Sequence, residues 1–266
     1  MQTMQTTLTS LHTLATLLLI GSLTACSTLV RTPGTAGLAG TDGAIAAYAR
    51  SLDKYVNANG EVDFVALRDD SSDLDRYVAF IANTPVTRFA NANDRLAHYI
   101  NSYNALSMYN VLESGIPRTH AGLSKLKFFV LRKLTIGGET RSLYSYENDV
   151  IRKLGDPRVH FALNCSAVSC PTLPRVPFTG VNIDAELDRE TRKFFADSKH
   201  FRLDRATHKA KVSEILKFYR EDFTPAHAPS LIEYVNRYSP APIPEGYGIE
   251  FLEYDWTVAN SRRPKL

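Results

Sequence analysis

The sequence predicts an α+β protein in which helices pack against a small antiparallel sheet. Several segments carry apolar residues at the spacing of an amphipathic helix, and a few short segments bounded by turns have the pattern of strands. The chain has 266 residues, of which 44% are hydrophobic and 22% are charged, which is the composition of a globular protein. No internal repeat is evident, and one domain over residues 42–258 is the simplest organisation.

The first part of this domain is predicted to be mainly helical. Apolar residues recur at intervals of three and four in Gly43–Val56 and again in Leu74–Ala82, with a short extended segment at Glu61–Phe64 between them. The longest helix is predicted at Arg95–Glu113. It follows a capping pair, Asn93-Asp94, and ends at a Ser-Gly-Ile-Pro stop.

The central part combines strands with one helix. Leu131–Ile136, the turn Gly137-Gly138 and the return segment Thr140–Leu143 predict a hairpin. Ser142–Leu154 predicts a helix that is closed by Gly-Asp-Pro. The apolar run Val159–Leu163 then predicts a strand.

The last part of the domain is also predicted to combine helices and strands. Asp184–Phe195 predicts a helix, His200–Val212 a hairpin, and Ser213–Phe223 and Ser230–Arg237 two further helices. Gly248–Trp256 alternates like an edge strand, and residues 259–266 form a C-terminal tail.

The N-terminal segment has the features of an export signal. Residues 1–25 contain no Asp, Glu, Lys or Arg, and Leu14–Leu23 is largely apolar but shorter than the roughly 20 residues that span a bilayer. The run leads into Leu-Thr-Ala-Cys26, which resembles the cleavage box of bacterial lipoproteins. That resemblance implies removal of residues 1–25 and lipidation of Cys26. A hydrophobic N-terminal helix is the alternative.

The same resemblance predicts a location. Ser27, rather than an acidic residue, follows Cys26, which in lipoproteins fits passage to the outer membrane, so we expect an anchor on its periplasmic face. Residues 26–41 are rich in Gly, Thr, Ala and Pro and would form the tether. The formal charge is +3 with no basic run, so nucleic-acid binding is not predicted.

Residues suited to catalysis are concentrated in Val159–Leu173, which contains His160, Asn164, Cys165 and Cys170. A cysteine hydrolase requires a thiolate, an imidazole within hydrogen-bond reach, and a polar group that fixes the imidazole. His160 and Asn164 would share one face of the predicted strand. However, about 13 Å would separate them at roughly 3.3 Å per residue, so Asn164 cannot orient the ring.

The orienting group must therefore come from elsewhere. Asn101 and Asn104 lie on the mostly apolar face of the long helix, where their amides need hydrogen-bond partners. Because helices of this fold class pack on the sheet, we expect these amides to face the strand of His160.

Two other interpretations of the cysteines remain open. Cys165 and Cys170 are separated by four residues, a loop that allows the Cα separation of about 4.4 to 6.8 Å that a disulfide requires. If Cys26 is lipidated, these two thiols face an oxidising compartment, which favours the disulfide. Zinc held by His160 and both cysteines lacks a nearby fourth ligand, so neither a metal nor another cofactor is predicted.

Three segments together resemble one family. Tyr99–Leu106 (YINSYNAL) resembles W-I-N-x-Y-N-A-L, and Asp156–Cys165 (DPRVHFALNC) with Ser169–Pro171 resembles D-P-R-x-H-F-A-L-N-C…S-C-P. Ile215–Phe223 (ILKFYREDF) resembles the pattern I-F-x-W-Y…D-F. Over about Val62–Tyr254 the chain is similar to the family called domain of unknown function 547.

This resemblance implies a distant similarity to papain-like and transglutaminase-like folds, in which a long helix packs on an antiparallel sheet and a histidine lies on a central strand. His160 would occupy the histidine position, and the helix with Asn101 and Asn104 would lie where those enzymes carry their cysteine. That helix has no cysteine here. Either Cys165 has become the nucleophile, or the chemistry was lost and the pocket retained.

We therefore expect a polar pocket with a cysteine loop beside it. The favoured function is a binding or scaffold domain for an unidentified ligand, such as a peptide or cell-wall material. The alternative is a cysteine hydrolase or acyl-transfer enzyme with Cys165 as nucleophile and His160 as base. The expected pocket residues are Asn101, Tyr103, Asn104, His160, Asn164 and Ser169.

Overall fold

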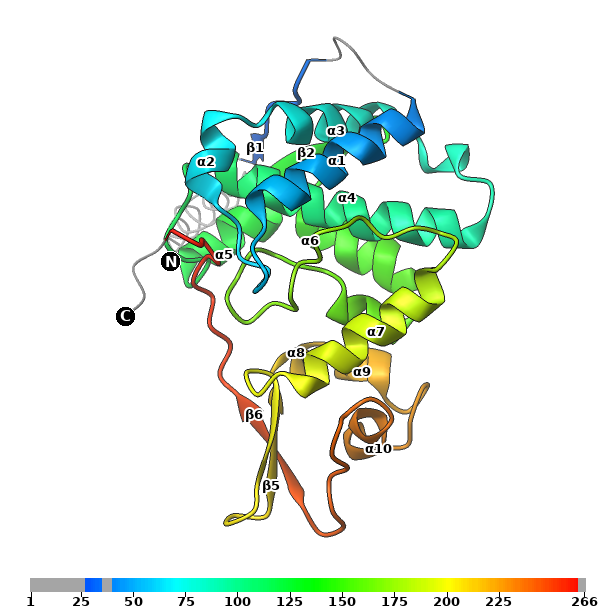
Figure 1. Ribbon diagram of the computed structural model, residues 1–266, viewed down its shortest axis with the longest axis vertical. Coiled ribbons are helices and arrows are strands. Elements are labelled where there is room, and N and C mark those ends of the chain that lie inside the picture. The colour runs from blue at the N-terminus through cyan, green and yellow to red at the C-terminus, as the bar shows by residue number, and fades with distance from the viewer. Residues whose placement is uncertain (1–26, 35–39, 263–266) are drawn as a thin grey trace, which may run out of the picture.

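The computed structural model describes residues 27–34 and 40–262, and Figure 1 shows how their helices and strands are arranged. The predicted signal, residues 1–25, and the predicted lipidation site Cys26 lie outside the described residues. In the figure, long helices fill the upper part of the molecule, while short helices and a narrow sheet form the lower part. Across the described ranges, no helix is long and apolar enough to cross a bilayer.

The upper part is built around α4 (Ala92–Glu113), which is buried along almost its whole length. Its N-cap is Asn91, whose side chain accepts a hydrogen bond from the backbone N–H of Asp94. The helix therefore begins slightly earlier than predicted. Helix α1 (Thr41–Tyr55) packs against α3 (Ser72–Asn83), and α3 packs against α4.

The α+β class is confirmed, but the sheets are not purely antiparallel. In the first sheet, β2 (Arg132–Ile136) pairs in parallel with β1 (Thr28–Leu29) and antiparallel with β3 (Glu139–Arg141). In the second sheet, the predicted hairpin of β4 (Phe201–Asp204) and β5 (Lys209–Ser213) is present. The third strand of that sheet is β6 (Gly248–Leu252), which pairs in parallel with β5 at the edge. Neither sheet closes into a barrel.

The remaining elements are short, apart from α7, and several depart from regular α-helix. The predicted helix Ser142–Leu154 begins at the Ser142 cap as expected but is divided into an α, a π and a 3-10 segment. The helices are α2 (Phe64–Asp69), η1 (Val86–Arg88), α5 (Leu123–Leu126), η2 (Lys127–Leu131), α6 (Leu143–Tyr146), η3 (Glu147–Ile151), η4 (Arg152–Leu154), α7 (Ile183–Ala196), α8 (Ile215–Phe218), α9 (Arg220–Phe223) and α10 (Leu231–Asn236).

The predicted strand Val159–Leu163 is wrong, because these residues lie in and just after a 3-10 helix, η5 (Pro157–Phe161). Asp156 caps this helix by accepting a hydrogen bond from the Arg158 N–H, and Pro157 occupies its first turn. An aspartate followed by proline favours a helix start, since the proline needs no N–H partner there. The predicted alternation of faces around His160 therefore does not apply.

Two hydrophobic clusters lie on either side of the segment that follows η5. The larger cluster contains the buried faces of α1, α3 and α4, and the smaller one contains aromatic residues of α7, α9 and α10 with the second sheet. His160 and the loop of residues 164–171, which we call the cysteine loop, lie where these clusters meet. The fold thus places the predicted site at an internal boundary.

Candidate functional site

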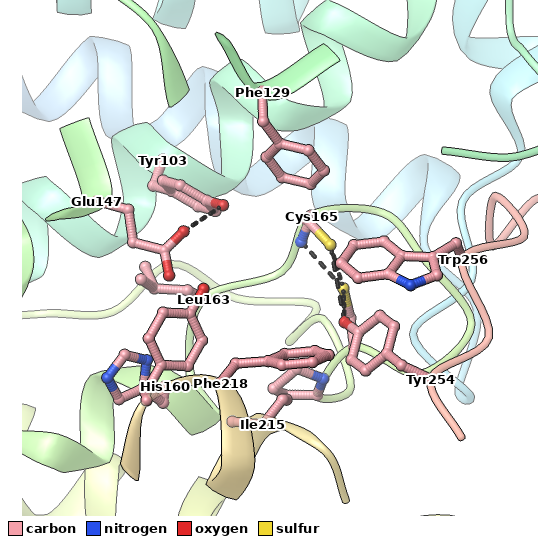
Figure 2. Close-up of a pocket in the computed structure, with 13 residues that line it drawn as sticks. Tyr103, Phe129, Glu147, His160, Leu163, Cys165, Ile215, Phe218, Tyr254 and Trp256 are labelled. Atoms are coloured by element: carbon pink, nitrogen blue, oxygen red, sulfur yellow. Dashed lines mark hydrogen bonds between the residues drawn. The ribbon is translucent and has the colours of Figure 1, made fainter. Parts of the chain in front are cut away.

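A cavity opens beside the cysteine loop, and Figure 2 shows the side chains around it. It is partly open to solvent. Most of its wall is aromatic or aliphatic, with one carboxylate, one imidazole and two thiols. It is lined by Tyr103, Phe129, Glu147, His160, Leu163, Cys165, Cys170, Pro171, Ile215, Phe218, Tyr219, Tyr254 and Trp256.

Each of the two π-helical segments contributes one wall residue. Phe129 comes from η2 and Glu147 from the start of η3. π-Helical turns are rare in proteins and occur frequently at functional sites. The η3 turn places Glu147 next to α4, where the carboxylate accepts a hydrogen bond of 2.9 Å from the Tyr103 hydroxyl.

His160 belongs to a separate polar network on the wall. Its Nε2 lies 2.7 Å from an Asp222 carboxylate oxygen, and its ring stacks on Tyr219 with centroids 4.0 Å apart. Arg152 holds the same carboxylate through two hydrogen bonds of 2.6 and 2.8 Å. Burial raises the pKa of Asp222, but the hydrogen bonds from His160 and Arg152 outweigh it and hold that pKa well below its ordinary value.

This network holds Tyr219, one of the aromatic residues of the wall, in position. Tyr219 contacts both the His160 ring, on which it stacks, and the Arg152 guanidinium, which lies 5.0 Å from the centroid of the Tyr219 ring. Burial, and then the nearby negative charge of Glu147, raise the pKa of the Tyr219 hydroxyl well above its ordinary value. Tyr219 is therefore a neutral hydrogen-bonding group beside the Glu147 carboxylate.

The structure does not join His160 to a thiol. His160 and Cys165 occupy separate parts of the wall in Figure 2, and no hydrogen bond connects them within the described chain. The Cys165 sulfur instead contacts Cys170 and, at 3.8 Å, the Tyr254 hydroxyl. Hydrogen bonding to Cys170, together with burial, raises the pKa of Cys165 well above its ordinary value. A nucleophilic Cys165 with His160 as its base is therefore not assembled here.

The predicted disulfide is also absent, because Cys165 and Cys170 are both free thiols. Their sulfur atoms are 2.8 Å apart, whereas a disulfide bond is about 2.05 Å long. The turn from Asn164 to Pro171 thus brings the two sulfur atoms into hydrogen-bond contact without a covalent bond.

The predicted amides bind backbone groups rather than the cavity. Asn101 exchanges hydrogen bonds with the backbone of Phe178. Asn104 donates to the Ala162 carbonyl and accepts from the N–H of Asn164. These contacts position the segments that carry the cavity wall, with no side-chain atom of either amide in that wall.

The other predicted pocket residues are divided between wall and support. The Asn164 side chain donates to the Pro171 carbonyl and accepts from the Ser166 N–H, which holds the cysteine loop. Ser169 accepts a hydrogen bond from the Asp255 N–H on the C-terminal segment. Tyr103 and His160 do line the cavity, so the structure brings these two together with both cysteines.

Several wall residues were not predicted. Tyr219 of the wall and Asp222, the partner of His160, lie in a motif that sequence analysis used only for the family resemblance, so the sequence did contain a signal for them. Tyr254 and Trp256 alternate in a segment that was interpreted as an edge strand. Glu147 carried no signal, since a glutamate in a helical pattern usually faces solvent. Among the described residues, no group of three or more His, Cys, Asp or Glu side chains is arranged to hold a metal ion.

Comparison with known proteins found one family model, which matches a segment that carries part of this site. Residues 87–195 match the family model described as "Protein of unknown function, DUF547". No curated protein and no solved structure matches the chain. The matched segment includes α4, both π-helical segments, η5 and the cysteine loop, whereas Tyr219, Tyr254 and Trp256 lie outside it. Over residues 87–195, the chain therefore carries a DUF547 domain.

Proposed function

We propose that this protein is a binding protein whose cavity receives the primary ammonium group of a ligand, with an apolar part of that ligand among the aromatic rings. The observation that carries the proposal is the position of Glu147, a carboxylate only 7% exposed, in the wall of an otherwise mainly apolar cavity. A cationic group of the ligand would pair with the negative charge of this carboxylate.

A buried carboxylate is costly unless it is paired or fully hydrogen-bonded. Glu147 accepts hydrogen bonds from the hydroxyls of Tyr103 and Tyr219, but it forms no salt bridge with any residue of the described chain. Arg152, which lies on the same helical stretch, is committed to Asp222, Glu221 and Asn148. Residues 27–34 and 40–262 therefore supply no cation to Glu147, and an ammonium group in the cavity is the natural partner.

The aromatic wall suits the same ligand group. Ammonium groups are attracted to the faces of tryptophan, tyrosine and phenylalanine rings. Lys125 already illustrates this at the cavity, since its Nζ lies 3.8 Å from the ring centroid of Trp256 and 5.4 Å from that of Phe218. An ammonium ligand would combine such contacts with the charge of Glu147.

Peptides and peptide-containing cell-wall material carry free amino groups, so they are the ligand class that we propose. We also propose that the protein is anchored through Cys26 on the periplasmic face of the outer membrane, as the lipoprotein box predicts. The proposed architecture is a divergent papain-like or transglutaminase-like one. Its support is the contact of α4 with the segment that follows His160, through Asn104 and Ala162.

A cysteine hydrolase that uses Cys165 and His160 is the rival function, and the geometry gives it less support. His160 faces Asp222, and the pKa of Cys165 is raised rather than lowered. Catalysis would require the imidazole to leave its carboxylate partner and approach the thiol. Labelling of Cys165 by a cysteine-hydrolase activity probe, lost in His160→Gln, would favour the rival.

Trp256 provides a direct assay for the binding proposal. It lines the cavity and is the single tryptophan in the sequence, so tryptophan fluorescence reports on this site alone. Titration with benzylammonium is expected to change the fluorescence at lower concentration than titration with benzyl alcohol, which has the same ring without the charge. Equal affinities for the two probes would contradict the proposal.

A carboxylate variant sharpens this test. Glu147→Gln retains the shape and removes the charge, and it is expected to weaken benzylammonium binding roughly ten- to hundred-fold while leaving benzyl alcohol unaffected. Glu250→Gln, a carboxylate half exposed on β6, is the matched control and should bind both probes as the wild type does.

A further inference from the structure

The two thiols of the cysteine loop occupy different environments. The Cys170 sulfur accepts hydrogen bonds from the backbone N–H groups of Cys165 at 3.1 Å and Ala167 at 3.4 Å. It also accepts a hydrogen bond of 3.2 Å from the Tyr254 hydroxyl. With the Cys165 thiol at 2.8 Å, donors surround the Cys170 sulfur, which is the arrangement that stabilises an anion.

The backbone conformation of the cysteine loop supports this arrangement of donors around the Cys170 sulfur. Ser166, which lies between the two cysteines, has a positive φ of 64°, a conformation that costs energy for a residue other than glycine. The Asn164 side chain holds it by accepting from the Ser166 N–H at 2.7 Å. This turn directs the N–H groups of Cys165 and Ala167 to the same sulfur. Strained residues of this kind cluster at functional sites.

We propose that Cys165 and Cys170 form a reactive dithiol that reduces small disulfides entering the cavity, with Cys170 as the attacking thiolate and Cys165 as the resolving thiol. This activity goes beyond ligand binding. Both sulfur-bearing side chains line the cavity, although Cys165 is 8% and Cys170 only 3% exposed, so the substrate is a low-molecular-weight disulfide rather than a folded protein.

The thiol acidities agree with these roles. Burial raises the pKa of Cys170, but the hydrogen bonds from Cys165, Tyr254 and the backbone outweigh it, so that pKa lies below its ordinary value. The pKa of Cys165 is raised, because its proton is shared with the Cys170 sulfur. Cys170 is therefore the thiol that ionises first.

The reaction balances with one disulfide as the oxidant. The Cys170 thiolate attacks one sulfur of the substrate RSSR, which forms a mixed disulfide and expels RS⁻. The expelled thiolate takes the proton of Cys165. The Cys165 thiolate then attacks the Cys170 sulfur, forms the intramolecular disulfide and releases the second RS⁻. This RS⁻ takes a proton from water, which balances the proton that Cys170 released to the solvent when it ionised. The cysteine pair is oxidised by two electrons and RSSR is reduced to two RSH.

The test uses the reduced protein and oxidised glutathione, with remaining thiols trapped by alkylation and mapped by mass spectrometry. The wild type is expected to form the Cys165–Cys170 disulfide without a lasting adduct. Cys165→Ser should accumulate glutathione on Cys170, while Cys170→Ser should react at least roughly tenfold more slowly, because Cys165 stays protonated. Equal adduct formation in the two variants, or no reaction of the wild type, would overturn the proposal.

A second measurement requires no change to either cysteine. Alkylation of the wild type across a pH series should modify Cys170 at lower pH than Cys165, and Tyr254→Phe should move the Cys170 midpoint up by about one pH unit through loss of one donor. Tyr247→Phe, a tyrosine beside β6 outside the cavity wall, is the control. If Cys165 is alkylated first, the assigned roles are wrong. Because Glu147→Gln leaves the thiols intact, the binding and redox proposals fail separately.

Discussion

Asn104 connects α4 to the cysteine loop, and its replacement by alanine is expected to destabilise the protein strongly. The side chain is 2% exposed. Its Nδ2 donates to the Ala162 carbonyl at 3.0 Å and its Oδ1 accepts from the Asn164 N–H at 2.7 Å. Asn104→Ala removes both hydrogen bonds and leaves a carbonyl and an N–H buried without partners.

The size of the effect follows from these two groups. An unpaired buried polar group costs about 1 to 3 kcal/mol, so the free energy of unfolding should fall by about 2 to 6 kcal/mol. That is a large part of the roughly 5 to 15 kcal/mol that stabilises a typical domain. Asn83→Ala is the matched control, because Asn83 is exposed and donates one hydrogen bond to the Ala79 carbonyl. We expect it to change stability by less than about 1 kcal/mol.

Urea denaturation followed by circular dichroism measures both variants. The reasoning would be refuted if Asn104→Ala lost less than about 1 kcal/mol, or no more than Asn83→Ala. Such a result would mean that water or a shifted side chain satisfies the Ala162 and Asn164 backbone groups, and that the loop does not depend on this amide.

Three further predictions concern titration and the anchor. The pKa of Asp222 is depressed in the folded state, so its contribution to folding stability is complete above the ordinary carboxyl pKa and is lost as pH falls below about 4. Asp222→Asn should therefore lose less stability than the wild type in acid denaturation scans. Burial lowers the pKa of His120 to about 4, so the wild type should lose stability as pH falls from about 6.5 to 4, and His120→Phe should flatten that part of the thermal-unfolding profile. Cys26→Ser should abolish acylation, as detected by mass spectrometry of the N-terminal peptide from membrane fractions; an acylated peptide in this variant would contradict the lipoprotein box.

Much of the fold follows from local sequence patterns. The apolar spacing in Arg95–Glu113 and the glycine turn after Ile136 are signals that act over a few residues, and the structure has α4 and the β2–β3 hairpin at these places. The strand predicted at Val159–Leu163 failed for a local reason as well, because the Asp-Pro helix start outweighed the apolar pattern. The parallel pairing of β5 with β6 could not be predicted, since nothing in either strand specifies its partner.

The site was harder to predict than the fold. The cysteine loop and His160 attracted attention through their residue types, but the partners that define their chemistry are distant in sequence. Tyr103 and Glu147 are 44 positions apart, and Tyr254 and Cys170 are 84 apart. Sequence spacing carries no information about such contacts. It therefore suggested Cys165 as the nucleophile, whereas the donors around the sulfur atoms favour Cys170.

The most direct test of the central claim is a crystal structure of the protein with benzylammonium. The account predicts that the ammonium nitrogen lies about 3 Å from the Glu147 carboxylate, with the ring of the probe against the aromatic wall, and that this density disappears in Glu147→Gln. An ammonium group bound elsewhere, or an unoccupied cavity at saturating probe, would contradict it.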